Sequence, residues 1–291
     1  MTGSVHQGMT TAADFARERD RVVRFAYRML GSLADAEDMA QETFLRWRAA
    51  GEPDLENPSA WMLRTCTRLC LDRQKAVQRR REAYVGEWLP EPLPATPRER
   101  EQLDESLSLA LLRTIQRLPA TERAVFLLHD VFGDSFAEVA AVLDLTPAHC
   151  RQLGVRARRH LRGPTRSAPE PATVDRLADA FFAAIASGDL PGLRELLASD
   201  VVLHSDGGGK APAARAPIDG AAAVARFFTR VFATAAQQHL QLRPAWFNGA
   251  PGRLVLEEER VVSAFHFHVE HGRIAAIFVH RNPDKLTRFD D

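Results

Sequence analysis

The sequence contains few cysteines, few lysines and no long apolar run. Three Cys among 291 residues are too few for the disulfide framework of small secreted domains. No run of eighteen apolar residues occurs, so the sequence predicts no transmembrane helix. The first fifteen residues, MTGSVHQGMTTAADF, lack the basic and apolar segments of a signal peptide. We therefore expect a cytoplasmic protein that does not associate with membranes.

Charge is balanced overall but distributed unevenly. The net charge is zero, which by itself gives no indication of a nucleic-acid partner. Residues 151–162, however, contain five Arg and no acid, and local charge density sets the potential that a phosphate backbone meets. Only three lysines stand beside 35 arginines, a bias typical of genomic composition. The retained lysines are therefore more informative than the arginines.

Apolar periodicity and proline content divide the chain into segments. The length predicts two or three globular domains. Helical patterns cover residues 12–30, 33–49 and 60–81, and Ser59 is the predicted cap of the third. Four prolines in residues 88–97 predict an extended connector. The predicted boundaries are an all-helical domain 1–81, a Pro-rich linker 82–105, a second helical domain 106–163, a linker 164–172 and a C-terminal domain 173–291.

The last 120 residues change from helical to strand patterns. Helices are predicted at 173–187, 190–198 and 221–235. The predicted strands are 241–247, 253–262, 264–269 and 274–280, separated by turns such as Asn248-Gly249. Helices followed by antiparallel strands indicate an α+β domain with a curved sheet.

An acidic amphipathic helix begins near Ser32. This serine and Asp35 match an N-cap and its N3 acid, and DAEDMAQETF follows with an apolar stripe that ends at Trp47. Such a face is commonly just solvated. Its charge order and aromatic spacing nevertheless resemble the polymerase-docking helix of extracytoplasmic-function sigma factors. The resemblance implies a surface for the clamp helices of core RNA polymerase, made of Asp35, Glu37, Asp38, Gln41, Glu42 and Phe44.

A helix-turn-helix is predicted between Ser135 and Leu161. A short apolar-faced helix is followed by a turn in which Thr146 caps and Pro147 starts the next, arginine-rich helix. A basic helix of a bundle is the alternative. With residues 118–133 before it, the segment resembles the sigma domain that reads the −35 promoter element and meets the polymerase flap. We expect base contacts from His149, Arg151 and Gln152, and phosphate contacts from Arg156, Arg158 and Arg159.

The predicted third helix has one apolar and one basic face. Residues 57–81 resemble the sigma helix and loop that open the −10 element by capturing unstacked bases, without covalent chemistry. A solvated basic face is the alternative reading. The residues that the resemblance assigns to −10 DNA are Trp61, Arg64, Arg68, Arg73 and Lys75.

Residues 181–210 are similar to the opening of a SnoaL-like domain of the NTF2-type cone fold. Sigma factors fused to this domain have three sequence marks, which stand here as WLPEPL (88–93), DGGGK (206–210) and NPDKL (282–286). The resemblance implies two all-α sigma domains plus a C-terminal α+β cone domain that controls them. The residues assigned to this regulation are Trp88, Pro90, Glu91, Asp206, Gly207, Gly208, Gly209, Lys210, Asn282, Pro283, Asp284 and Lys285.

Two of the three lysines lie inside these marks. We expect Lys210 and Lys285 to fasten the C-terminal domain to the linker and sigma domains, with residues 207–209 allowing close approach or positive φ. A small anionic ligand bound by the glycine loop and Lys210 is one alternative, and chance retention is another. The expected partners are core RNA polymerase and promoter DNA. A small ligand of unidentified structure in the SnoaL-like domain is the third partner considered.

Catalysis in the C-terminal domain is the competing hypothesis. His266 and His268 share a strand face, which would either line a cone pocket or face solvent. Two histidines without a third ligand are weak evidence for a metal site. We expect no catalytic residues, no metal and no cofactor, and the alternatives are a ligand-sensing helix-turn-helix regulator or a DNA binder with an enzymatic cone domain. The side chains weighed for catalysis are His204, Asp206, His266, His268, Glu270 and His280.

Overall fold

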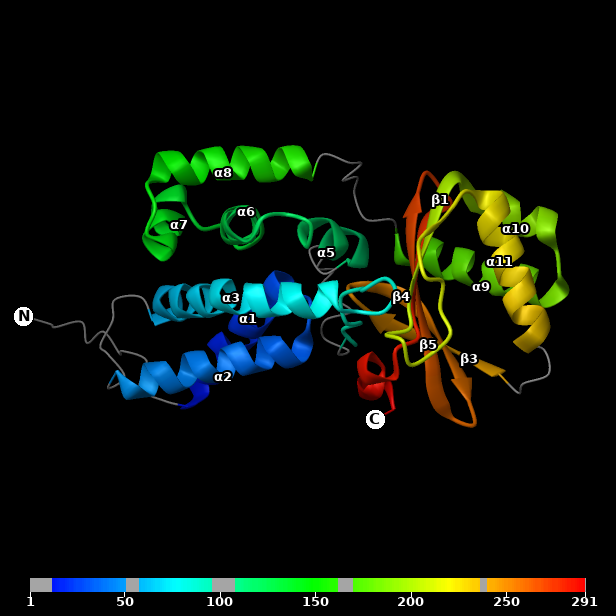
Figure 1. Ribbon diagram of the computed structural model, residues 1–291, viewed down its shortest axis with the longest axis horizontal. Coiled ribbons are helices and arrows are strands. Elements are labelled where there is room, and N and C mark those ends of the chain that lie inside the picture. Colours follow the sequence, from blue (N-terminus) through cyan, green and yellow to red (C-terminus); the bar gives the residue numbers. More distant parts are fainter. Residues whose placement is uncertain (1–11, 51–57, 96–107, 162–169, 236–239, 291) are drawn as a thin grey trace, which may run out of the picture. The chain divides into compact units, whose positions relative to one another are not determined.

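The computed structural model describes residues 12–50, 58–95, 108–161, 170–235 and 240–290. They belong to two compact units (Figure 1). The first unit is drawn from Met1–Arg80 and Thr114–Gly163, and the second from Arg81–Arg113 and Pro164–Asp291. The segment between the two helical regions of the sequence therefore belongs to the C-terminal unit. Within the described ranges, no helix is long and apolar enough to cross a membrane.

The first unit is helical throughout its described residues. Its core contains Phe25, Met62 and Leu128, all fully buried. Arg123 is also buried, and its guanidinium donates to the carbonyl oxygens of Met29 and Ile115, which satisfies a charge that would otherwise destabilise the interior. Its elements are α1 (Ala12–Leu30), α2 (Leu33–Ala49), α3 (Pro58–Glu82), α6 (Ala120–Phe126), the π-helix η2 (Leu127–Val131), α7 (Phe136–Leu143) and α8 (Pro147–His160), while α5 (Leu109–Ile115) crosses the boundary between the units.

The predicted helix caps are confirmed in two places and wrong in one. Ser32 accepts from the Asp35 N–H at the start of α2, and Thr146 accepts from the His149 N–H at the start of α8, with Pro147 in the first turn. The predicted cap at Ser59 is wrong because α3 already begins at Pro58. The Ser59 hydroxyl instead accepts from Arg21 and donates to Glu18, so a tertiary contact replaces the local one.

The second unit is built on a six-stranded sheet in the order β2-β1-β6-β5-β4-β3. The pairings of β3 with β4, β4 with β5 and β5 with β6 are antiparallel, as predicted, whereas β1, which was not predicted as a strand, pairs with β6 in parallel. The predicted helix 190–198 also ends early, at Leu196, and β1 follows it directly. The strands are β1 (Leu197–Asp206), β2 (Ile218–Asp219), β3 (Leu240–Phe247), β4 (Ala250–Glu257), β5 (Arg260–Glu270) and β6 (Arg273–His280).

A tight hairpin divides the segment predicted as one strand, 253–262. β4 ends at Glu257 and β5 begins at Arg260, with Glu258 and Glu259 between them at φ of 48° and 68°. These values match a two-residue turn of type I′, which needs positive φ at both positions, usually supplied by Gly, Asn or Asp. Two glutamates carry no such signal, so the sequence pattern gave no indication of the turn.

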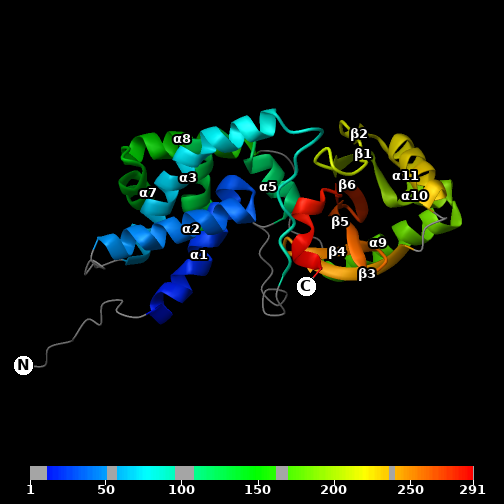
Figure 2. The same ribbon diagram turned by 60° about the horizontal axis from the view of Figure 1, so that its bottom comes forward.

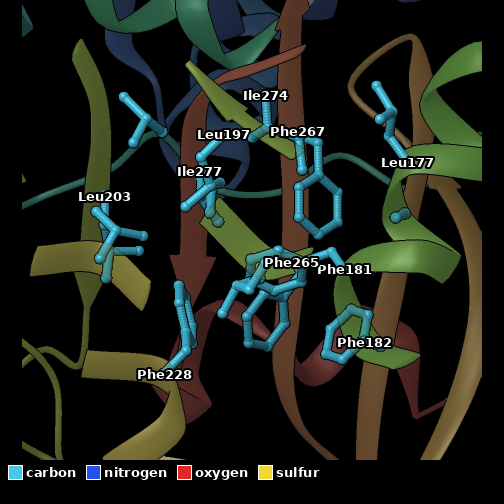
Figure 3. Packing of buried hydrophobic residues seen from close by; sticks show 14 of the residues in the cluster. Leu177, Phe181, Phe182, Leu197, Leu203, Phe228, Phe265, Phe267, Ile274 and Ile277 are labelled. Atoms are coloured by element: carbon cyan, nitrogen blue, oxygen red, sulfur yellow. The ribbon is translucent and has the colours of Figure 1, made fainter. Parts of the chain in front are cut away.

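Three helices cover one face of this sheet: α9 (Pro171–Ser187), α10 (Leu190–Leu196) and α11 (Ala221–Ala235) (Figure 1). Phe181 of α9 is at the centre of the core, with its ring centroid 5.0 Å from Phe228 and 5.3 Å from Phe267 in edge-on packing (Figure 3). These aromatic rings pack with aliphatic side chains in one buried cluster between helices and sheet, and burial of such apolar surface favours folding of this unit.

The described part of the linker covers the other face of the sheet, together with the 3-10 helices η3 (Pro283–Lys285) and η4 (Thr287–Phe289) (Figure 2). The linker is extended, as predicted, and it pairs with the edge strand β3. Pro94 forms an antiparallel bridge with Phe247, Ala95 N–H donates to the Trp246 carbonyl oxygen at 2.9 Å, and Asn248 N–H donates to that of Leu93 at 2.9 Å. The linker thereby covers an exposed sheet edge.

Candidate linker clamp and nucleic-acid interface

Asp206 is the centre of the contacts between the linker and the C-terminal domain. It lies at the end of β1, fully buried. Its Oδ1 accepts from the Tyr84 hydroxyl at 2.6 Å, and its Oδ2 accepts from the Leu89 N–H at 2.9 Å. Its own carbonyl oxygen accepts from the Arg281 and Asn282 N–H groups, at 2.7 and 2.9 Å. One residue of β1 therefore holds both the linker and the segment after β6.

Lys285 completes this arrangement from η3. Its Nζ donates to Asp206 Oδ2 at 2.7 Å and to the Leu89 carbonyl oxygen at 2.6 Å. The same ammonium lies 4.4 Å from the Trp88 ring centroid and 5.1 Å from that of Tyr84, within cation–π range. Only 7% of the Lys285 side chain is exposed. We call the contacts among Tyr84, Trp88, Leu89, Asp206, Asn282 and Lys285 the linker clamp.

Burial shapes the electrostatics of the linker clamp. Burial lowers the pKa of Lys285, and the adjacent Asp206 carboxylate opposes that effect. Burial and the hydrogen bond to Asp206 both raise the pKa of Tyr84, so its hydroxyl stays protonated and donates. Breaking one side of a buried, hydrogen-bonded ion pair typically costs about 3–5 kcal/mol. The linker clamp is therefore a strong local attachment rather than a surface contact.

The DGGGK mark forms a tight turn against the linker. Gly208 and Gly209 have φ of 61° and 72°, a region that favours glycine. A Cβ on Gly208 would collide with the Asn282 amide and lie 2.9 Å from the Tyr84 hydroxyl, and one on Gly209 would lie 3.0 Å from Val85. The expectation of close approach and positive φ is confirmed at both glycines. Lys210, in contrast, is 56% exposed and binds Asp284 at 2.5 Å.

Further polar contacts attach the linker beside the linker clamp. Glu87 accepts from Arg113 at 2.8 Å and lies 3.0 Å from His204 Nδ1. Burial favours the neutral carboxyl, but the hydrogen bonds from His204 and Arg113 outweigh it and lower the pKa of Glu87. Burial lowers the pKa of His280 to about 4, so this ring is neutral and its Nε2 donates to the Pro90 carbonyl oxygen at 2.8 Å.

His266 neither lines the cavity nor faces solvent. His266 is buried against Phe247 and Phe278, on the face that the linker covers, and burial lowers its pKa to about 3. His268 is half-exposed and binds Glu270 at 3.0 Å. A cavity of about 500 Å³ lies instead on the helical side of the sheet, lined by residues such as Phe228 and Phe265. Among the described residues, no cluster of three or more His, Cys, Asp or Glu could hold a metal ion.

The helix α8 presents a polar face to solvent. Cys150, Leu153 and Ala157 form its buried side. Arg158 is half-buried and donates to Asp130 at 2.7 Å, while Arg156 lies 3.5 Å from Glu122. The predicted DNA-contacting residues on its exposed side are His149, Arg151, Gln152, Arg156 and Arg159.

The basic face of α3 is engaged within the first unit. Arg64 donates to Asp144 at 2.9 Å, and Arg68 also binds this carboxylate. Asp144 caps the C-terminus of α7 in a left-handed backbone conformation, with a φ of 55°. It belongs to the turn of the helix-turn-helix, and its carboxylate points to Arg64 of α3. Lys75 is exposed, and Trp61 is half-buried.

The acidic helix α2 divides into buried and exposed positions. Asp35 is buried and accepts from Arg73 at 2.8 Å and from Arg80 at 2.5 Å. It therefore fastens α2 to α3 and does not lie on an open docking surface, contrary to the simplest form of the prediction. Asp38 and Gln41 are exposed. The other residues predicted for the polymerase-docking surface are half-buried: Glu37, Glu42 and Phe44.

Three family models match the chain in succession. Sigma-70 region 2 matches residues 15–81, Sigma-70 region 4 matches residues 108–161, and the SnoaL-like domain matches residues 178–277. The chain is 38% identical to the ECF RNA polymerase sigma factor SigJ of Mycobacterium tuberculosis, over 74% of this chain and 71% of that protein. The chain belongs to the extracytoplasmic-function RNA polymerase sigma factors.

Other relatives agree with this assignment. The probable ECF sigma factor SigI of Mycobacterium tuberculosis is 35% identical over 64% of this sigma factor and 66% of its own length. The crystal structure of Mycobacterium tuberculosis SigJ superposes with a TM-score of 0.76 at 31% identity, covering 95% of this chain and 98% of that one. The predicted family and fold class are confirmed. Sigma factors direct core RNA polymerase to promoter DNA, so promoter-dependent initiation is the function of this chain.

Sequence reasoning missed several residues of this sigma factor that hold its parts together. Tyr84 and Glu87 bind Asp206 and His204 from 122 and 117 positions away in the chain. Asp144 binds Arg64 across 80 positions. Tyr84 is one of only two tyrosines in the sequence, and it lies four residues before WLPEPL, which is the one signal that pointed to it.

Proposed function

We propose that this sigma factor is restrained by its own C-terminal domain, which holds the linker between regions 2 and 4 through the linker clamp. The observation that carries the proposal is the buried Asp206–Lys285 pair, with Leu89 bound by both partners. The family resemblance implies that this linker enters the polymerase interior. A linker held on the sheet face does not do so at the same time, and polymerase binding therefore competes with the linker clamp.

The helical surfaces have separate roles in this proposal. The exposed Asp38 and Gln41 and the half-buried Glu42 dock on polymerase, while Asp35 holds α2 in place from behind. His149, Arg151 and Gln152 read bases of the −35 element, and Arg156, Arg158 and Arg159 contact phosphates. What supports this division is the exposure of His149, Arg151 and Gln152 and the partial intramolecular pairing of Arg156 and Arg158.

Region 4 also restrains the residues assigned to the −10 element. Arg64 and Arg68 share Asp144, so a carboxylate of the helix-turn-helix occupies the positions of DNA phosphates. These pairs are about half exposed, and exposed ion pairs contribute about 0–1 kcal/mol each. Promoter DNA, with its much higher charge density, displaces Asp144 once region 4 is bound elsewhere.

The C-terminal domain in this proposal regulates and does not catalyse. His266 and His280 are neutral and buried beneath the linker rather than in the cavity. The protein acts in the cytoplasm, where its polymerase and DNA partners are.

Run-off transcription with core polymerase tests the restraint. Lys285→Met should release the linker, which makes the Leu89 amide exchange faster, and should raise promoter-dependent product several-fold at limiting polymerase. Lys210→Met is the matched control, because its exposed pair with Asp284 lies outside the linker clamp, and should behave as wild type. Tyr84→Phe, a milder change, gives the same direction if Lys285→Met does not fold. Faster linker exchange without any gain in transcription would refute the restraint.

A further inference from the structure

We infer that the cavity of the SnoaL-like domain binds a small apolar molecule with a carboxylate head, and that this ligand tightens the linker clamp. The binding site is argued from the cavity itself, whereas its regulatory consequence rests on the proposed function. Calorimetry tests the binding site, and hydrogen exchange of the linker tests its regulatory consequence.

The cavity has the size and lining of a small-molecule site. Its volume is about 500 Å³, within the usual range of ligand pockets, and it lies between α11 and the sheet. Aromatic side chains form much of its wall, including Phe227, Phe228, Phe232 and Phe265. Phe228 and Phe265 are the labelled members of this wall in Figure 3, where their rings face the interior between helix and sheet. An apolar ligand body is favoured by such a surface.

One cation in the wall has unused hydrogen-bonding capacity. Arg281 follows β6, and its Nη1 donates to the Pro212 carbonyl oxygen at 2.9 Å. Its buried Nε has no hydrogen-bond partner among the described residues. Unpaired buried donors are costly, and a guanidinium donates two parallel hydrogen bonds to a carboxylate in a two-point contact. The geometry therefore favours a carboxylate over a neutral or cationic head group.

The charges around Arg281 agree with an anionic ligand. Burial lowers the pKa of Arg281 and the Glu257 carboxylate in the same wall opposes that effect, while the guanidinium remains charged at neutral pH. Arg230 also lies in the wall. The hydroxyls of Ser205 and Ser263 supply further donors near the head group.

The cavity and the linker clamp are made by consecutive residues of β1 and of the segment after β6. On β1, Ser205 lines the cavity and Asp206 belongs to the linker clamp. After β6, Arg281 lines the cavity and Asn282 binds Tyr84 at 2.7 Å. The Arg281 N–H donates to the Asp206 carbonyl oxygen. A ligand that fixes Arg281 therefore fixes the backbone from which the linker clamp is built, so it binds the clamped state more tightly.

Calorimetry on the full chain with 4-phenylbutyrate and 4-phenylbutanol tests the site. The two probes differ in the head group alone, and we expect the carboxylate to bind at least about tenfold more tightly. Arg281→Met should remove this preference and keep the binding of the alcohol. Val231→Trp, a change at a 37% exposed position of the wall, should abolish binding of both. Equal affinities in wild type, or full binding by Val231→Trp, would refute the site.

Hydrogen exchange of linker residues 84–95 tests the coupling. Saturating 4-phenylbutyrate should slow it in wild type and leave it unchanged in Val231→Trp. Binding without slower linker exchange would refute the coupling and leave the restraint standing. If 4-phenylbutyrate slows linker exchange but does not reduce the run-off product, the restraint is refuted instead. The site and its coupling would then be present without a regulatory effect.

Discussion

His266→Phe should change how the stability of the C-terminal unit depends on pH. His266 is buried between Phe247 and Phe278, with ring centroids 5.7 and 6.1 Å away, and its Nδ1 has no hydrogen-bond partner among the described residues. A phenyl ring fills nearly the same space without a polar atom. At pH 7.5 we therefore expect the free energy of unfolding to change by less than about 1.5 kcal/mol.

The magnitude follows from proton linkage. The pKa of His266 is 6.5 in the unfolded chain and about 3 in the folded protein, because burial disfavours the charged ring. Between these values the unfolded chain binds one more proton, so stability falls as pH falls, by up to 1.36 kcal/mol per pH unit. From pH 7.5 to 5.0 this removes about 2 kcal/mol from wild type. The variant lacks this loss, while the contribution of His280 remains in both proteins.

Urea unfolding read by pulsed hydrogen exchange measures this difference in β5 and β6 separately from the helical unit. The free energy of unfolding is compared between pH 7.5 and 5.0 in each protein. His268→Gln is a matched control on the same strand face, where a half-exposed ring is hydrated in both states. The reasoning is refuted if wild type and His266→Phe lose stability equally over this pH range.

Three further predictions concern the linker clamp, α8 and α2. Asp206→Ala should lower the free energy of unfolding of the C-terminal unit by about 3–5 kcal/mol, and the double variant with Lys285→Met should lose clearly less than the sum of the single losses, as measured in urea. Thr146→Ala should cost about 1 kcal/mol, measured as faster amide exchange in the first turn of α8. Reversing the charge of both Asp38 and Glu42 to Lys should weaken binding to core polymerase at least tenfold by fluorescence anisotropy.

Each of these has a defined contrary outcome. Additive losses in the urea series would mean that Asp206 and Lys285 are not energetically coupled. Unchanged amide exchange after Thr146→Ala would mean that the cap does not hold the recognition helix. Asp20→Lys, at an exposed acid of α1, is the control for the polymerase experiment. Equal weakening of polymerase binding by this variant would mean that the α2 result reflects overall charge rather than a docking surface.

Local patterns in the sequence were sufficient for most helices and for the family. Thr146 and Pro147 marked the start of α8 because a cap is satisfied by backbone groups within three residues. Prolines kept the linker extended for an equally local reason, the fixed φ of the ring. The hairpin at Glu258 and Glu259 was missed because its positive φ is imposed by the pairing of β4 with β5, and neither residue signals it.

Only tertiary packing decided which charged groups meet. Asp35 and Asp38 differ little as sequence, yet one is buried against two arginines and the other is exposed. Lys210 and Lys285 looked alike too, and only Lys285 is enclosed with Asp206 and the linker. Helical period and caps depend on neighbours within a few residues, whereas an ion pair across 79 positions exists only after the sheet has formed and removed its partners from water.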